Sequence, residues 1–542
     1  MKLKYIYFII AAFIIIVAAP SCKKDLAKAN TNPDQITAEK YDPNLLLTTV
    51  QLGYPGATNF GGSAWATKWG AVGCFVQHVA STNSGFYYGD KYFNNITSMG
   101  ELFQDSYTSS VQPVVELYQL TINKPQYRNL HQMARIMKAM VFEQITDQYG
   151  DIPYFQAGLG YYDRIYTPVY DTQKAIYADL LKEVSQATDS LDESADKPSG
   201  DILYAEASDQ IKEWKMFGNS LLLRMAMRLT KVDVPTAQAY VKKVIGNTMQ
   251  SNGDNAIINR EITGNAITEN QDGVQILGND STDLRLSSTI VNNMQSNSDP
   301  RLSVVAWLYQ RDSSSNAVTD TTPSHQLGLP PGFIVGGANP IYDITKHKGY
   351  PIGNADGQYA GLYGYSRLND NILSTTAPNL ILTYAETEFL LADAAARWGT
   401  LAGLNGMSDA VTHYENGVNA AVMQLSAYGS FPSINSFNAD KYYNIVKFTT
   451  TTNSNTALNL INTQYWLCTL MDEYEAWSNW RRTGFPVLTP TLYPGTGVTT
   501  IPRRLTYPPS QKTTNLANYN AAVARIIPGG DKMTSLVWWD KQ

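Results

Sequence analysis

The stretch LHQMARIMKAMVFEQITDQYGDIPY, residues 130–154, decides the fold, because its apolar side chains recur every three or four positions. This spacing gives a helix one continuous apolar face. The members of that face are Leu130, Met133, Ala134, Met137, Val141 and Ile145. The pattern stops where Gly150 and Pro153 interrupt it, since both residues break helices. The stretch therefore predicts a long helix that packs against neighbouring helices.

Further segments on both sides of the chain show the same helical spacing. One begins after Asp171, a favourable N-cap residue, and its face is Ile176, Leu180, Val184 and Leu191. A third carries Trp214, Phe217, Leu221, Leu222, Met225 and Leu229. Helices resume at Asn379, with the face Ile381, Ala385, Phe389, Ala392 and Ala396, and continue over 410–425 and 464–480. We predict a mainly α protein built from helix pairs of the tetratricopeptide kind, although the signature of that repeat does not recur at a fixed period.

The region of about 247–376 has a different character, because Gly, Asn, Ser, Thr and Pro cluster there. Val304–Tyr309, with β-branched and aromatic residues, is the clearest candidate for a strand. Loop regions of this length inside a compact protein are often functional. We predict one domain over 43–542, in which this loop-rich insert forms a second face on the helical scaffold.

Composition excludes some classes of function. The 542 residues include 41 Lys and Arg against 47 Asp and Glu, a net charge of −6, which does not suit a nucleic-acid binder. Hydrophobic residues make up 44% of the chain, enough for a sizeable core. Aromatic residues are unusual, since 35 Tyr stand beside 16 Phe and 10 Trp. Tyr and Trp combine a flat apolar face with a polar group, so their excess suits a hydrated binding surface.

The first residues have the pattern of an exported lipoprotein. Lys2 and Lys4 precede an uncharged run from Tyr5 to Ala19, which suits a signal peptide and is short for a transmembrane helix. The run ends at Pro20, Ser21 and Cys22, an arrangement that resembles a bacterial lipobox. We predict a signal peptide over 1–21, lipidation of Cys22 and a polar tether over 22–42, with ordinary cleavage nearby as the alternative.

The two remaining cysteines, Cys74 and Cys468, lie far apart among apolar residues. We expect two free thiols rather than a disulfide.

Catalytic and metal-binding motifs are absent from the sequence. The five histidines form no zinc-binding spacing, and there is no G-x-S-x-G, P-loop or dinucleotide motif. Glu386 with Glu388, or Asp472 with Glu475, could be proposed as the carboxylates of a glycosidase. The first pair points apart on a helix, and the second is expected to be a solvated face near Arg481 and Arg482. We therefore predict no enzyme activity, no cofactor and no metal.

Aromatic residues gather in two loop-rich regions, and these are the candidate ligand-binding sites. Sugars stack their C–H faces on aromatic rings and need polar partners at their edges, and peptides suit the same surface. The candidates are Trp65, Trp69, Tyr87, Tyr88, Tyr92, Tyr342, Tyr350, Tyr359, Tyr363 and Tyr365. Two alternatives remain open: the two tryptophans could form one buried helix face, and the tyrosines of the glycine-rich insert could fasten that loop to the scaffold.

Motifs along almost the whole chain resemble the SusD/RagB family, in its SusD-like branch. They are Tyr149-Gly150-Asp151-Ile152-Pro153-Tyr154, Trp214 through Arg228, Asp299-Pro300-Arg301-Leu302, Leu382-Thr383-Tyr384-Ala385-Glu386, Leu390-Leu391-Ala392, Glu475-Ala476-Trp477, Trp480-Arg481-Arg482-Thr483-Gly484, Pro502-Arg503-Arg504, Tyr507-Pro508 and Trp538-Trp539-Asp540-Lys541. The order and spacing of these motifs carry the resemblance more than any single one. The charged residues after Cys22 also resemble the tags that send Bacteroidetes lipoproteins to the cell surface.

The resemblance implies a helical fold with a loop-rich face and attachment to the outer membrane through Cys22. It also implies a partner, a SusC-like TonB-dependent transporter, to which the protein delivers nutrients without cleaving them. The ligands of the family are most often oligosaccharides and sometimes peptides. The expected function is therefore cell-surface capture of an oligosaccharide. The alternatives are a peptide ligand, a surface-anchored glycan hydrolase, or a scaffolding protein without a small ligand.

Overall fold

The computed structural model describes most of the chain and divides it into two units, residues 1–43 and 44–542. The described residues are 41–56, 62–83, 85–264, 266–277, 283–311, 317–337, 339–353, 361–401, 403–526 and 529–541. The predicted signal peptide and Cys22 lie outside the described residues. The account below concerns the second unit.

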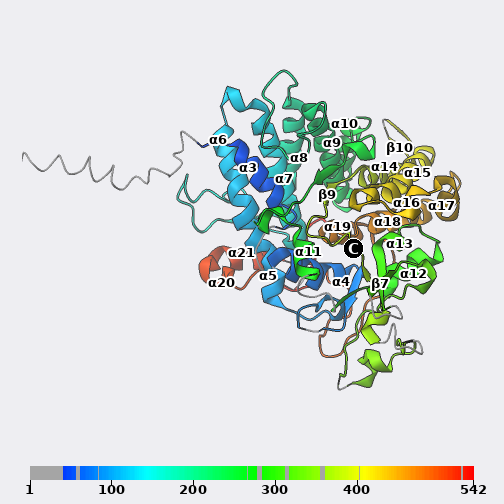
Figure 1. Ribbon diagram of the computed structural model, residues 1–542. Coiled ribbons are helices and arrows are strands. Elements are labelled where there is room, and N and C mark those ends of the chain that lie inside the picture. Colours follow the sequence, from blue (N-terminus) through cyan, green and yellow to red (C-terminus); the bar gives the residue numbers. More distant parts are fainter. Residues whose placement is uncertain are drawn as a thin grey trace, which may run out of the picture. The chain divides into compact units, whose positions relative to one another are not determined.

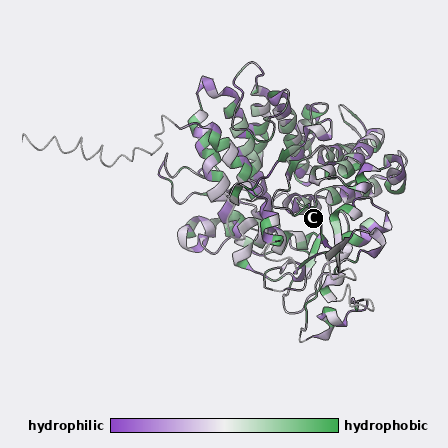
Figure 2. Ribbon diagram, viewed as in Figure 1, coloured by the Kyte–Doolittle hydropathy of each residue, from purple (hydrophilic) through white to green (hydrophobic). Residues whose placement is uncertain are grey.

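Helices dominate this unit, so the predicted mainly α class is confirmed (Figure 1). The first group is α3 (Asn44–Gly53), α4 (Gly73–Phe75), α5 (Ile96–Ser106), α6 (Gln112–Thr121), α7 (Arg128–Tyr149), α8 (Gln173–Ser190), α9 (Gln210–Arg228) and α10 (Val234–Val244), with the π-helical segments η1 (Gly62–Val72) and η3 (Tyr107–Val111). Consecutive members from α6 to α10 pack against one another, as in the predicted helix pairs. Figure 2 shows apolar and polar residues mixed around these helices, because each buries one side.

The second helical group follows the insert. It comprises α14 (Tyr384–Trp398), α15 (Met407–Met423), α16 (Pro432–Asn435), α17 (Ala439–Val446), α18 (Ser454–Cys468), α19 (Glu473–Thr483), α20 (Gln511–Thr514) and α21 (Leu516–Arg525). Helix α14 packs against α15, α18 and α9, and thereby joins the two groups. Its start is fixed by a capping box, in which the side chains of Thr383 and Glu386 each accept a backbone N–H of the other.

The insert contains short helices and small antiparallel sheets. Its helices are α11 (Gln271–Ile276), α12 (Ser288–Ser296) and α13 (Leu302–Val305). The strands of the unit are β1 (Val79–Ser81), β2 (Ile152–Pro153), β3 (Tyr170–Asp171), β4 (Ala256–Ile258), β5 (Leu284–Leu286), β6 (Ala306–Arg311), β7 (Ala317–Asp320), β8 (Arg367–Leu368), β9 (Asn379–Leu382), β10 (Thr400–Leu401) and β11 (Leu404–Asn405). They pair as β1–β5, β2–β3, β4–β9, β7–β6–β8 and β10–β11.

Three sequence-based boundaries were wrong. Asn379 begins strand β9, which pairs with β4, and the helix starts only after the capping box. The predicted strand Val304–Tyr309 begins at Ala306, because the residues before it form α13. The N-cap of α8 is Thr172, since the Asp171 carboxylate instead accepts the backbone N–H groups of Tyr154 and Phe155. At Asn379 and Asp171 a contact with residues distant in the chain overrides the local pattern.

A network of buried charges lies where α7, α9, α14 and α19 meet. The Arg228 guanidinium pairs with Glu475 and with Asp147, the latter at 2.9 Å. Arg224 lies 3.3 Å from Glu143 and 3.6 Å from Glu386. The expectation that the pair Asp472 and Glu475 forms a solvated face is therefore wrong for Glu475, which is buried against arginines of another helix.

The C-terminal residues close this network. Arg481 is buried, donates to the backbone oxygen of Asp147 at 2.7 Å, and lies over the rings of Trp477 and Trp539. Trp539 donates its indole N–H to Asp147 at 2.9 Å. Arg503 pairs with Asp540, which is also buried. Trp539 and Asp540 therefore belong to the core, as does Arg481 in the last turn of α19.

The buried carboxyl of Glu386 makes stability depend on pH. Burial raises the pKa of Glu386 from 4.5 to about 8, and Arg224 only partly opposes this shift. The folded protein therefore keeps this proton at pH values where the unfolded chain has lost it, so this group lowers the free energy of unfolding as pH rises from about 4.5 to about 8.

Glu386→Gln mimics the protonated carboxyl and keeps an acceptor for the capping box. We predict that at pH 8.5 this variant is more stable than the wild type by about 1–2 kcal/mol, and that the difference shrinks toward pH 5. Denaturant unfolding at both pH values measures it. A variant less stable than the wild type at pH 8.5 would mean that the folded protein holds a stabilising, ionised Glu386.

Candidate functional site

The pairing of β1 with β5 joins the two aromatic regions that the sequence analysis singled out. Ala80 of β1 lies opposite Arg285 of β5, which belongs to the central insert. Ala80 also packs in a small apolar cluster with Leu329, Ile344 and Tyr365. The N-terminal loops and the insert therefore form one surface, although about 200 residues separate β1 from β5 in the chain.

Trp65 and Phe86 form the aromatic part of this surface. Their ring centroids lie 5.0 Å apart with an interplanar angle of 34°. The Trp65 indole N–H donates to the Tyr87 hydroxyl at 3.0 Å, which fixes the orientation of the indole. Phe86 is 55% exposed and Trp65 is half-buried, whereas Tyr87 is buried. Tyr87 thus positions Trp65 from beneath.

A polar pair lies next to these rings. The Asn83 side chain accepts the backbone N–H groups of Gly85 and Phe86 at 2.8 and 3.2 Å, which shapes the turn that presents the Phe86 ring. The same Asn83 donates to the Asp283 carboxylate at 2.9 Å. An amide and a carboxylate beside two aromatic rings can bind the hydroxyl groups of a ligand stacked on those rings.

Tyr363 belongs to the same region of the insert. The Arg285 guanidinium, on the strand paired with β1, donates to the backbone oxygen of Leu362 at 3.0 Å and holds the turn that carries Tyr363. Burial lowers the pKa of Arg285 to about 10. The Tyr363 ring is 58% exposed. We call Trp65, Asn83, Phe86, Asp283 and Tyr363 together the aromatic surface.

Several predicted site residues are buried and pack the loops instead. They are Trp69, Tyr87, Tyr88, Tyr92 and Tyr365. Trp69 donates its indole N–H to Asp272 at 2.7 Å, and the Tyr92 hydroxyl accepts the backbone N–H of Thr491 at 3.2 Å. Tyr365 belongs to the cluster around Ala80. These rings have no free face. The sequence analysis left burial open for Trp69, as part of a helix face, and for Tyr365, as loop packing, but expected Tyr87, Tyr88 and Tyr92 to bind ligand.

The remaining three candidates lie elsewhere in the insert. Tyr342 packs on Tyr493 with ring centroids 5.1 Å apart and donates to the backbone oxygen of Leu492 at 2.7 Å. Tyr350 is half-buried and lines an open cleft of about 900 Å³ together with Asp320 and His325. Tyr359 lies outside the described residues.

Sequence reasoning did not select Phe86, Asn83 or Asp283. Phe86 lies in a run with Tyr87 and Tyr88, and nothing in their order shows which ring faces solvent. The usable signal was Asn83, because an Asn two residues before a Gly favours a side-chain-capped turn that exposes the residues after it. Asp283 could not be recognised without the β1–β5 pairing.

Metal binding has no support in the described part of the chain, where no group of three or more His, Cys, Asp or Glu side chains could hold an ion. Cys74 and Cys468 are free thiols, as expected. Within the same residues, no helix combines the length and the apolar character needed to span a bilayer.

Comparison with known proteins assigns the family. A model of the SusD-like family, described as Susd and RagB outer membrane lipoprotein, matches residues 71–540. The chain therefore belongs to this family, whose members are binding proteins of the outer membrane, and the predicted SusD-like fold is confirmed. No curated protein matches the chain.

Solved structures agree over nearly the full length. A chitin-binding protein is 29% identical, with a TM-score of 0.72 over 92% of this chain and 100% of its own. A Bacteroidetes AC2a SusD-like protein is 24% identical, with a TM-score of 0.75 over 93% of this chain and 100% of its own. A SusD homologue from Bacteroides uniformis is 22% identical, with a TM-score of 0.71 over 93% and 100%. The last two similarities concern the fold alone.

The two tryptophans of η1 provide a test of surface against core. Trp69→Ala removes a fully buried ring and a hydrogen bond to Asp272, so we predict a loss of about 3–5 kcal/mol in the free energy of unfolding. Trp65→Ala removes a half-buried ring, and we predict a loss of about 1–2 kcal/mol. Denaturant unfolding of both variants measures the difference. Equal losses would mean that Trp65 belongs to the core and is not available to a ligand.

Proposed function

We propose that this protein captures an oligosaccharide on the aromatic surface and delivers it to a SusC-like TonB-dependent transporter in the outer membrane. The observation that carries the proposal is the ring pair of the half-buried Trp65 and the exposed Phe86 beside the Asn83–Asp283 pair. Membership in a family of outer-membrane binding proteins supports it, as does the similarity to a chitin-binding protein.

The chemistry of the surface suits a sugar. The C–H face of a pyranose stacks on an aromatic ring, and its hydroxyl groups need donors and acceptors at the ring edge. Asn83 offers an amide and Asp283 a carboxylate, and Tyr363 adds a further exposed ring with a hydroxyl. Because the similar chitin-binding protein binds a polymer of N-acetylglucosamine, chitin oligosaccharides are the first ligands to test.

The surface is suited to binding rather than cleavage. Glycoside hydrolysis uses two carboxyl groups placed across the scissile bond. The aromatic surface as defined has one, on Asp283, and Asn83 already donates a hydrogen bond to it. Stacking on an open surface gives modest affinity and fast release, which suits a carrier that hands its ligand to a transporter.

Phe86→Ala and Tyr363→Ala should each weaken binding of a chitin oligosaccharide about tenfold, because each removes one stacking ring. Isothermal titration calorimetry measures the affinities. Tyr161→Ala is the matched control, since Tyr161 is 86% exposed but lies outside the aromatic surface, and its affinity should equal that of the wild type.

Other outcomes decide between the alternatives. Binding that is unchanged in Phe86→Ala and Tyr363→Ala would place the ligand elsewhere and reject the aromatic surface. Binding of peptides but not of oligosaccharides would assign a peptide ligand. Shortened oligosaccharides after incubation with the purified protein would indicate a hydrolase.

Anchoring can be tested separately. Cys22 is proposed to carry the lipid, with the binding unit on the cell exterior. Cys22→Ala should therefore move the protein from the membrane fraction to the soluble fraction, because the lipid chains supply its membrane affinity. Fractionation followed by immunoblotting measures this, and protease treatment of intact cells reports exposure of the wild type. A variant that stays in the membrane fraction would contradict lipidation at Cys22.

A further inference from the structure

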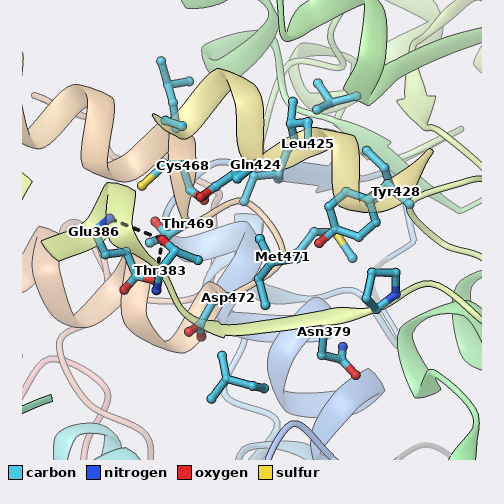
Figure 3. Close-up of a pocket in the computed structure, with 18 of the residues that line it drawn as sticks. Asn379, Thr383, Glu386, Gln424, Leu425, Tyr428, Cys468, Thr469, Met471 and Asp472 are labelled. Atoms are coloured by element: carbon cyan, nitrogen blue, oxygen red, sulfur yellow. Dashed lines mark hydrogen bonds between the residues drawn. The ribbon is translucent and has the colours of Figure 1, made fainter. Parts of the chain in front are cut away.

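A second concave site lies inside the unit, where the helical scaffold meets the insert (Figure 3). It is a narrow cavity of about 60 Å³, enough for about five water molecules or a ligand with a similar number of heavy atoms. Its walls come from α14, α15, α18, β9 and the α18–α19 link on the scaffold side, and from α12 and α13 of the insert. None of the residues of the aromatic surface lines it.

Polar groups gather at one end of the cavity. Figure 3 shows Gln424, Cys468, Thr469 and Glu386 grouped there, with Asp472 nearby, while Tyr428 lies toward the other end. Gln424 is 5% exposed, and its amide nitrogen donates to the backbone oxygen of Cys468 at 3.2 Å. Its amide oxygen is buried and has no hydrogen-bond partner among the described residues. A buried acceptor without a hydrogen-bond donor reduces the free energy of unfolding. We therefore expect this oxygen to accept a hydrogen bond from an N–H or O–H group of a ligand.

Asp472 is the charge on the wall that lacks an ion pair among the described residues. Two cations that line the cavity are each neutralised by their own partner: Lys68 by Asp272 at 2.7 Å and Arg301 by Asp299 at 2.6 Å. Among the described residues, the Asp472 carboxylate accepts the capping N–H of Glu475 at 3.3 Å and no other hydrogen bond, and the charges of Arg224 and Lys68 oppose the rise of its pKa. Burial raises the pKa of Asp472 to about 6, so the group is still mostly ionised at neutral pH.

Arg301 contributes a hydrogen-bond donor to the cavity, whereas Gln424 and Asp472 contribute acceptors. One of its terminal guanidinium nitrogens is buried without a hydrogen-bond partner among the described residues, although its charge is balanced by Asp299. We expect this nitrogen to donate a hydrogen bond to a neutral acceptor, such as a hydroxyl oxygen, because Asp299 already balances the charge of Arg301. Leu425, Leu470 and Met471 supply apolar wall between the polar groups.

We propose that this cavity binds a small amino alcohol, with the ammonium group at Asp472 and the Gln424 amide oxygen and the hydroxyl oxygen at Arg301. The ammonium supplies the positive charge and the donors that the first two groups lack, and the hydroxyl accepts from the third. A short carbon chain fits between the apolar residues. Ethanolamine, with about four heavy atoms, fits the volume, whereas phosphoethanolamine exceeds it.

The test is calorimetric titration of the purified protein with ethanolamine, ethylene glycol, glycine and phosphoethanolamine at pH 7.5. Ethanolamine should bind at one site. Ethylene glycol lacks the charge, glycine adds a carboxylate that no free cation balances, and phosphoethanolamine is too large, so these three should bind at least tenfold more weakly. Absence of ethanolamine binding, or equal affinity for ethylene glycol or glycine, would overturn the proposal. Binding of phosphoethanolamine as tight as that of ethanolamine would do the same, and would point to a lipid headgroup.

Variants locate the binding. Asp472→Asn should reduce the affinity for ethanolamine by tenfold or more while the fold is kept, because Asn is as good an N-cap for α19 as Asp. Asp209→Asn is the matched control: Asp209 caps α9 in the same way and lies outside the cavity, so this variant should bind as the wild type does. Gln424→Leu should also lose affinity. Unchanged binding in Asp472→Asn would overturn the assignment. None of these variants touches the aromatic surface, so oligosaccharide binding provides an independent check.

Discussion

The pairing of Arg228 with Asp147 and Glu475 is the interaction on which the rest of the structure depends. It joins α7, α9 and α19, which lie far apart in the chain, and all three side chains are buried. Breaking a buried pair by removing one partner leaves an unbalanced charge and typically costs about 3–5 kcal/mol. Because Trp539 and Arg481 bond to the same Asp147, the C-terminal residues are also held here. The scaffold is therefore closed around one charged centre.

The pairing of β1 with β5 holds the N-terminal loops and the central insert in fixed positions on this scaffold. This short ladder fastens an N-terminal segment to the central insert, and the cluster around Ala80 fills the space beneath it. The half-buried Trp65 is supported by the buried Tyr87, and the turn that carries the exposed Tyr363 is held by Arg285. A large share of the aromatic excess serves this support, and a smaller share is left at the surface.

The helices could be predicted from the sequence because their apolar periodicity is strong, as the face from Leu130 to Ile145 illustrates. The charged centre could not, since the pair Asp472 and Glu475 has the same spacing as an exposed salt-bridge pair and only the tertiary contact with Arg228 distinguishes it. The sequence indicated the two regions that contain the proposed site, but it did not identify which residues in them face solvent. Tyr87 and Phe86 are adjacent aromatic residues, and their opposite burial depends on an Asn83 turn and a β pairing about 200 residues away.

The central claim is that two distant loop regions form one ligand-binding surface around Trp65 and Phe86. A crystal structure of the protein with a bound chitin oligosaccharide tests it most directly. The account predicts a sugar ring stacked on Trp65 or Phe86, with hydrogen bonds from its hydroxyl groups to Asn83 or Asp283. An oligosaccharide bound in the cleft beside Tyr350, with the Trp65 and Phe86 rings uncovered, would contradict it.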